Sequence, residues 1–238
     1  MSDTIAALST PMAPGGIGVI RISGNDAISI ADKIVKTTSG KRLSDLKGYS
    51  AAHGKVYNGG EMLDECVALV FRQPKSYTGE DTVEISCHGG VFVSSRVLRA
   101  VFEAGARPAQ GGEFTKRAFL NGKMDLSEAE AVMSLISARG EGGMKAALTA
   151  LDGALSKKID AYCEVLVSAA ANMAAWVDYP DDEIPELDFS VLEKSLNEVY
   201  YGLEGLLSKF DAGKAITDGV ETAIVGKPNV GKSALMNM

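Results

Sequence analysis

The residues that most clearly predict chemistry are residues 226–233, which read G-K-P-N-V-G-K-S. They match the phosphate-binding loop G-x-x-x-x-G-K-[S/T], in which backbone N–H groups surround the phosphates of a nucleotide. In that pattern the lysine reaches the β- and γ-phosphates and the serine hydroxyl binds Mg²⁺, while the glycines let the backbone approach the ligand closely. The predicted nucleotide-binding residues are Asn229, Val230, Gly231, Lys232, Ser233 and Ala234, with Ser233 as the Mg²⁺ ligand.

A phosphate-binding loop lies between a strand and a helix, and both are expected here. Residues 220–225 read V-E-T-A-I-V, which is typical of a short buried strand, and residues 234–238 begin a helix. The loop by itself does not distinguish GTP from ATP. The segment that reads the base and the second Mg²⁺ ligand are expected beyond residue 238, so we expect little or no nucleotide hydrolysis by this chain.

The overall composition is that of a globular protein of one or two domains, with 238 residues, 46% of them hydrophobic and 23% charged. No apolar run reaches the roughly 18 residues that a membrane span needs, and the first residues lack the pattern of a signal peptide. A net charge of −7 argues against nucleic-acid binding through the overall field of the chain. The three cysteines form no C-x-x-C pair, which favours a reducing cytoplasm over a zinc site or a disulfide framework.

The first 110 residues mix strand and helix patterns too irregularly for a doubly wound sheet, so a compact α+β domain is the better prediction. Alternating or continuous apolar runs predict the strands, and apolar residues at helical spacing predict the helices. The expected strands cover residues 17–22, 66–71 and 82–86, and the expected helices cover residues 26–35 and 91–102. A short helix ended by Gly122 follows.

Beyond about residue 123 the apolar spacing is helical throughout. Ser127 and Glu130 fit a capping box that opens a helix to about Arg139. The acidic, proline-containing residues 178–188 indicate a connector between antiparallel helices, with a metal or partner site as the alternative. Two apolar stripes mark the helices on either side of it. They consist of Ile159, Tyr162, Leu166, Ala169, Met173 and Trp176, and of Leu192, Leu196, Val199, Leu203, Leu206 and Phe210.

Several segments, taken together and in order, resemble the MnmE (TrmE) family of GTPases, which modify the wobble uridine of certain tRNAs. The resemblance covers essentially the whole chain. The segments read T-I-A-A-L-S-T-P at 4–11, G-G-I-G-V-I-R-I-S-G at 15–24, S-Y-T-G-E-D-T-V-E at 76–84, H-G-G at 88–90, G-E-F-T-K-R-A-F-L-N-G-K at 112–123 and D-L-S-E-A-E at 125–130.

The resemblance implies an α+β N-terminal domain that is similar in fold to folate-dependent aminomethyltransferases, binds a formyltetrahydrofolate and dimerises. It also implies a helical domain with a GTPase domain inserted into it, of which this chain would hold only the first part. The expected domains are residues 1–121 for folate binding and dimerisation, 122–217 for the first part of the helical domain, and 218–238 for the first strand and P-loop of a truncated α/β G domain. The helical stripes are then expected to lack partner helices and to be exposed.

The family's folate contacts match Arg21, Glu84 and Lys123 of this sequence. The carboxylate of Glu84 suits the N–H groups of a reduced pterin, and the cations suit the formyl oxygen and the glutamate tail. Residue types alone would favour surface ion pairs at these positions, and the resemblance reverses that interpretation. His88 has the chemistry of a catalytic base, but a lone histidine at a strand end is more often structural, so it is left out of the predicted site.

The resemblance also implies K⁺, held partly by Asn229, and GTP hydrolysis when two G domains meet. The implied cofactors are therefore GTP, Mg²⁺, K⁺ and 5-formyltetrahydrofolate or a related tetrahydrofolate. The implied partners are a second copy of the chain, an FAD-dependent protein of the MnmG type, and tRNA as substrate in the cytoplasm. Together they would install a carboxymethylaminomethyl-type group at the wobble uridine with a tetrahydrofolate-derived one-carbon unit.

Two other functions remain open from the sequence. The chain could be a folate-binding dimerisation module without independent catalysis. It could also be a one-carbon transferase of the aminomethyltransferase type, although such an enzyme has no need of the phosphate-binding loop at 226–233.

Overall fold

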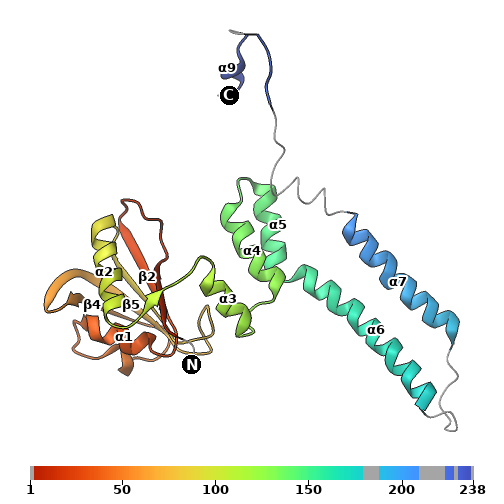
Figure 1. The fold of residues 1–238 in the computed structure, drawn as a ribbon, viewed down its shortest axis with the longest axis horizontal. Helices are drawn as coiled ribbons and strands as arrows, with labels where there is room; N and C mark the ends of the chain where they lie inside the picture. The colour runs from red at the N-terminus through yellow and green to blue at the C-terminus, as the bar shows by residue number, and fades with distance from the viewer. Residues whose placement is uncertain (1–2, 179–187, 209–222, 228–229, 237–238) are drawn as a thin grey trace. The chain divides into compact units, whose positions relative to one another are not determined.

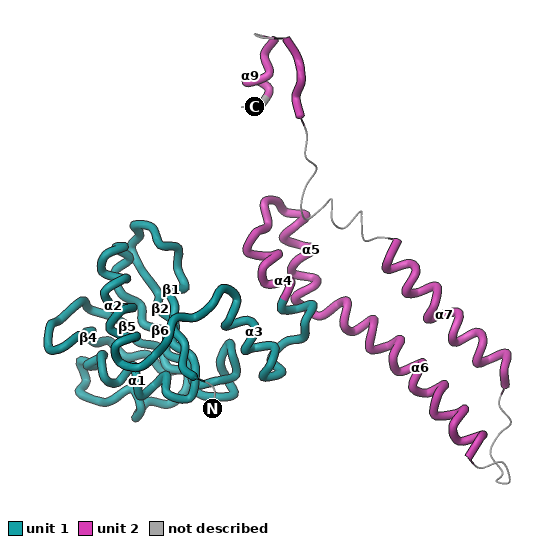
Figure 2. The backbone as a smooth tube through the Cα atoms, in the orientation of Figure 1, with its two compact units in different colours: residues 1–129 teal, residues 130–238 magenta. Residues whose placement is uncertain are grey.

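The computed structural model of the chain describes residues 3–178, 188–208, 223–227 and 230–236. The chain divides into two compact units, Met1–Ala129 and Glu130–Met238, which Figure 2 shows in different colours. The first unit contains the described strands, and the second unit is helical over most of its described length.

The first unit is built on a seven-stranded sheet with the strand order β3-β4-β5-β6-β2-β1-β7 (Figure 1). All neighbouring strands pair antiparallel except β1 and β7, which are parallel. This sheet confirms the predicted mixture of strands and helices. Its strands are β1 (Ile5–Leu8), β2 (Ile17–Ser23), β3 (Val35–Thr37), β4 (Ser50–Asn58), β5 (Glu61–Phe71), β6 (Thr82–His88) and β7 (Arg107–Pro108).

The core of this unit lies between one face of the sheet and the helices α1 (Ala27–Ile34) and α2 (Val91–Glu103). Side chains alternate between the two faces of a strand, so Ile20 and Ile22 of β2 are fully buried while Arg21 lies on the opposite face. The same alternation along β6 buries Val83 and Ile85 and leaves Glu84 on the face of Arg21. The face away from these helices therefore carries Arg21 and Glu84, two of the three predicted folate residues.

The hairpin of β4 and β5 was not predicted. Its two-residue turn, Gly59–Gly60, has φ angles of 56° and 94°, which a type I′ turn requires of both central residues. No strand was predicted over β4, and the strand predicted at 66–71 covers only the second half of β5, because Glu61–Glu65 is too polar to resemble a strand. Pairing with β4, rather than burial, stabilises that half of β5.

The helices α3 (Glu113–Leu120) and α4 (Leu126–Ser137) follow, and α3 ends as predicted before Gly122, whose φ is 67°. The predicted capping box of α4 is wrong by two residues. The Asp125 N–H donates to Glu128 Oε2 at 2.8 Å, and the Glu128 N–H donates to Asp125 Oδ1 at 2.8 Å. Ser127 lies within the first turn, so its hydroxyl donates to Asp125 Oδ1 instead of capping the helix.

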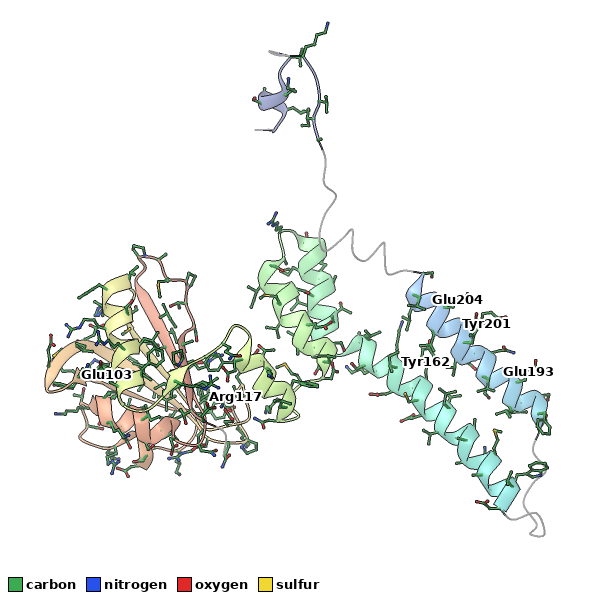
Figure 3. All side chains as sticks on the ribbon, in the orientation of Figure 1. Glu103, Arg117, Tyr162, Glu193, Tyr201 and Glu204 are labelled. Atoms are coloured by element: carbon green, nitrogen blue, oxygen red, sulfur yellow. The ribbon has the colours of Figure 1, made fainter. Side chains whose placement is uncertain are left out.

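The second unit contains α5 (Glu141–Leu151), α6 (Ala154–Asp178) and α7 (Phe189–Leu207), and the helix predicted over 145–177 is broken at Gly153, whose φ is 71°. Helices α6 and α7 lie side by side (Figures 1 and 3), with Tyr162 of α6 against Gly202 of α7. A Cβ atom on Gly202 would lie 2.3 Å from the Tyr162 hydroxyl, so a larger residue at this position would require the Tyr162 side chain to move.

The predicted stripe on α6 is largely exposed among the described residues, with Leu166 at 40% and Trp176 at 43%, whereas Val199 on α7 is buried. Phe210 and the connector over 179–187 lie outside the described residues. None of the helices in the described ranges combines the length and apolarity needed to cross a bilayer.

Candidate functional site

Arg21 and Glu84, two of the three predicted folate residues, form an ion pair on the face of the sheet opposite α1 and α2. They occupy directly paired positions of β2 and β6. Arg21 Nε and Nη2 each lie 2.8 Å from Glu84 Oε1. The two side chains are 24% and 22% exposed, so the pair is accessible from one side but largely removed from water.

Two aromatic rings flank the guanidinium of Arg21. Its Cζ atom lies 5.0 Å from the centre of the Tyr77 ring and 5.5 Å from that of Phe114, both within cation–π range. The Tyr77 hydroxyl lies 2.8 Å from Thr115 Oγ1, which ties the loop before β6 to α3. Neither ring was predicted to belong to the site, although each lies inside a segment that carries the family resemblance.

Lys123 contacts the same loop that carries Tyr77. Its Nζ donates to the Pro74 carbonyl at 3.1 Å, and Asn121 Nδ2 donates to the Thr78 carbonyl at 2.7 Å. Lys123 therefore reaches the loop and not the Arg21–Glu84 pair itself. Arg21 of β2 and Lys123, which follows α3, both contact this loop, and Glu84 of β6 pairs with Arg21.

The chemistry of this cluster fits a planar heterocycle with N–H groups. Glu84 supplies an acceptor, Arg21 and Lys123 supply cations, and the rings of Tyr77 and Phe114 supply apolar faces. A tetrahydrofolate has these complementary features, namely pterin N–H groups, a ring system and carboxylates. The residues present thus fit the group that the resemblance implies.

A second charge network holds α3 against the sheet unit. The Arg117 side chain, only 9% exposed, lies 3.1 Å from Glu80 Oε2, 2.9 Å from Asp3 Oδ1 and 3.2 Å from Glu113 Oε1 (Figure 3). A hydrogen bond from Arg107 lowers the pKa of Glu113 to about 2. Glu80 lies in the same loop as Tyr77, and Glu113 is next to Phe114 in α3. The network therefore holds in place both segments whose rings flank Arg21.

His88, which the sequence analysis left out, is held by Asp64. Asp64 Oδ1 accepts from His88 Nδ1 at 2.7 Å, and Asp64 Oδ2 accepts from the His88 backbone N–H at 2.7 Å. This hydrogen bond raises the pKa of His88. A pocket of about 280 Å³ beside it is lined by Gly16, Ile17, His53, Glu65, Cys66, Val67, Ser86, Cys87 and His88.

The phosphate-binding loop is only partly described, because Pro228 and Asn229 lie outside the described residues. Lys232 Nζ donates to the carbonyls of Gly226 and Lys227 at 2.8 and 2.7 Å, so the lysine side chain spans the loop. Helix α9 (Lys232–Met236) begins at this lysine, as expected of the motif. Gly231 has a φ of 85°, which explains the glycine at that position.

The buried strand predicted before the loop is wrong for the described residues Ala223–Val225, which have no strand pairing and leave Val225 91% exposed. A strand requires a neighbour for its backbone hydrogen bonds, and the described strands of the chain all belong to the sheet of the first unit. Nor do three or more His, Cys, Asp or Glu residues of the described ranges gather as a metal site.

Residues 4–123 match the family described as the GTP-binding protein TrmE N-terminus, and residues 126–232 match the MnmE helical domain. The chain belongs to the MnmE family. The two matched ranges meet close to the boundary between the first unit, which contains the sheet, and the second unit, which is helical.

Among individual MnmE relatives, the chain is 46% identical over 235 residues to the tRNA modification GTPase MnmE of Caldicellulosiruptor saccharolyticus, covering 99% of this chain and 52% of the relative. It is 46% identical over 239 residues to the protein of the same name from Moorella thermoacetica, covering 100% of the chain and 51% of the relative. For the protein from Geobacillus kaustophilus the identity is 44%, over 99% of the chain and 52% of the relative. The chain thus spans about half the length of these MnmE relatives.

Proposed function

We propose that this chain forms the N-terminal part of a GTP-binding, GTP-hydrolysing tRNA modification enzyme that binds a tetrahydrofolate at Arg21, Glu84 and Lys123. The complete enzyme would act with an FAD-dependent partner of the MnmG type in the cytoplasm. It would install a carboxymethylaminomethyl-type group at the wobble uridine of tRNA. The tetrahydrofolate would supply the one-carbon unit, and nucleotide hydrolysis would require segments outside this sequence.

The observation that carries this proposal is the Arg21–Glu84 pair between two aromatic rings, in the part of the chain that matches the TrmE N-terminus. A surface ion pair contributes little to stability and needs no aromatic enclosure. A pair that binds a ligand benefits from the carboxylate and from the two rings, because they hold the guanidinium in place. It then loses little conformational freedom when the ligand binds. Family membership supports the choice of a folate as that ligand.

The nucleotide site in this proposal uses Asn229, Val230, Gly231, Lys232, Ser233 and Ala234. Lys232 would exchange its carbonyl partners for phosphate oxygens, and Ser233 would bind Mg²⁺, which usually takes one or two protein ligands together with substrate phosphates. Asn229 would contribute an oxygen to K⁺. We propose domain limits of 1–121, 122–217 and 218–238, an aminomethyltransferase-like fold for the first domain, and dimerisation through it.

Calorimetric titration of this chain with 5-formyltetrahydrofolate tests the folate site. The matched control is Arg96→Ala, because Arg96 also pairs with a carboxylate, Glu61 at 2.7 Å, but lies on α2, which packs on the other face of the sheet from Arg21. Saturable binding that Arg21→Ala abolishes and Arg96→Ala preserves is expected. No binding by a folded wild-type chain would contradict the proposed folate site.

A second function, a folate-binding dimerisation module without independent catalysis, is favoured by the exposure of Ala223–Val225 before the phosphate-binding loop. Sedimentation would report the dimer. Titration with a fluorescent GTP analogue would separate the two functions for this chain. Folate binding without nucleotide binding would support the module, whereas Mg²⁺-dependent nucleotide binding lost in Ser233→Ala would support the first proposal.

A further inference from the structure

The Asp64–His88 pair has the geometry of a prepared binding group. Both oxygens of one carboxylate hold one histidine, by the ring at 2.7 Å and by the backbone at 2.7 Å. The Asp64 side chain is 12% exposed, whereas the His88 side chain is 72% exposed. Since Nδ1 is occupied by the carboxylate, Nε2 is the ring nitrogen through which His88 can bind a ligand.

The pair lies in line with the Arg21–Glu84 cluster. Glu84, Ser86 and His88 are every second residue along β6, so their side chains leave the backbone on the same face of the sheet. At about 3.3 Å per residue, the backbone positions of Glu84 and His88 are about 13 Å apart. A site that used both ends would take an elongated ligand.

The surface between the two ends is apolar. In the row between Glu84 and His88, Ser86 is paired with Val67 on one side and Val19 on the other, and Ile17 is opposite His88 in the next row. Val67 and Ile17 are 44% and 66% exposed, and they line the pocket of about 280 Å³ beside His88. These side chains could cover the flat face of an aromatic ring.

We propose that His88, positioned by Asp64, binds the carboxylate tail of the folate whose pterin end lies at Arg21 and Glu84. The sequence of features along β6 is a hydrogen-bonding ion pair, an apolar stretch and an imidazole. A tetrahydrofolate has the same order, with its pterin, its aminobenzoyl ring and its glutamate. This inference rests on the proposed folate site and names the group that would bind the other end of the ligand.

The charges around His88 determine how this binding depends on pH. Asp64 and Glu65 of β5, His53 and Lys55 of β4, and the buried thiols of Cys66 and Cys87 are the titratable groups near the ring. Lys55 lies 3.8 Å from Glu65 and offsets part of its charge. Because Asp64 raises the pKa of His88, the imidazolium persists toward neutral pH, and tail binding is strongest below that pKa.

The test compares 5-formyltetrahydrofolate with the amide of 5-formyltetrahydropteroate, in which an uncharged amide replaces the glutamate, by calorimetry at pH 6.0 and pH 8.0. For His88→Gln we expect the folate affinity to fall roughly three- to tenfold at pH 6.0, the size of one ordinary hydrogen bond at an exposed site, with the affinity for the amide unchanged. The wild-type affinity for folate should fall between pH 6.0 and pH 8.0, and this fall should be smaller in His88→Gln. Asp64→Asn should act in the same direction.

Equal affinities of wild type and His88→Gln for the folate would overturn the tail site and leave the folate site intact. An equal loss of both ligands would also overturn it, because it would indicate that His88 acts on the fold. Failure of the folded wild type to bind either ligand would reject the folate site itself and the tail site with it.

Discussion

Arg21 and Glu84 lie at directly paired positions of two adjacent strands, with Arg21 Nη2 2.8 Å from Glu84 Oε1. Without the other, each residue would be a charged side chain on the uncovered face of a strand. Together, enclosed by Tyr77 and Phe114, they form a preorganised polar group on the face of the sheet that α1 and α2 leave open. The strand register, rather than proximity in sequence, brings them into contact.

Replacing Glu84 with glutamine should weaken folate binding strongly and reduce the stability of the fold only slightly. The pair is partly exposed, so its loss should reduce the free energy of unfolding by only about 1 kcal/mol. Affinity for 5-formyltetrahydrofolate should fall at least about tenfold, since Arg21 loses its anionic partner and the ligand an acceptor. Glu61→Gln, which removes the partner of Arg96, is the control and should leave folate affinity unchanged. Similar affinities for the two variants would argue against a binding role.

Arg117→Met should strongly destabilise the first unit. Its guanidinium is largely buried and faces the buried carboxylates of Glu80 and Glu113 as well as the exposed Asp3. Its removal leaves the two buried carboxylates without this cation, at a cost of about 3–5 kcal/mol. Urea denaturation followed by circular dichroism measures this loss. Arg96→Met, which breaks an exposed pair, should cost less than about 1 kcal/mol. Equal effects of the two substitutions would show that the Arg117 network does not support the fold.

Stability should decrease in acid partly through Glu113. Its pKa is lowered from 4.5 to about 2 in the folded chain by the Arg107 hydrogen bond. Because the folded-state pKa is the lower one, the contribution of Glu113 to stability is complete above about pH 5 and is lost as the pH falls toward 2. Urea midpoints measured from pH 6 to pH 2.5 should therefore fall less steeply in Glu113→Gln. An unchanged slope would mean that Glu113 is not perturbed by folding.

Two adjacent glycines after β6 should differ sharply in their tolerance of a methyl group. A Cβ atom on Gly89 would lie 2.7 Å from the Gly15 carbonyl oxygen, a backbone atom, whereas one on Gly90 would lie 3.8 Å from Val93 Cγ2. Gly89→Ala should shift the segment beside the His88 pocket and destabilise the unit by about 1–3 kcal/mol. Gly90→Ala should be nearly neutral. Thermal unfolding distinguishes the pair, and equal melting temperatures would contradict the close contact.

Substitutions in the phosphate-binding loop should leave folate binding intact, because the two proposed sites lie in separate units. Lys232→Ala should abolish any binding of a fluorescent GTP analogue, since its Nζ also bonds to the Gly226 and Lys227 carbonyls. Lys227→Ala is the control, because only its backbone oxygen takes part in that contact. Loss of folate affinity in Lys232→Ala would mean that the division into independent sites is wrong.

The sequence alone determined the family, the phosphate-binding loop and the elements with strong local signals. The regular apolar spacing predicted β2, α1, β6 and α2 within a residue or two, because burial on one face imposes a short repeat. The motif at 226–233 likewise predicted a helix from residue 234, and α9 begins two residues earlier, at Lys232.

Tertiary structure decided the features that depend on residues distant in sequence. Strand β4 has little apolar pattern of its own and forms because it pairs with β5. The enclosure of Arg21 combines residues from β2, β6, the loop before β6 and α3, and the support of His88 by Asp64 depends on the register of β5 and β6. Such contacts arise from strand pairing and helix packing, which bring together residues that no local pattern relates.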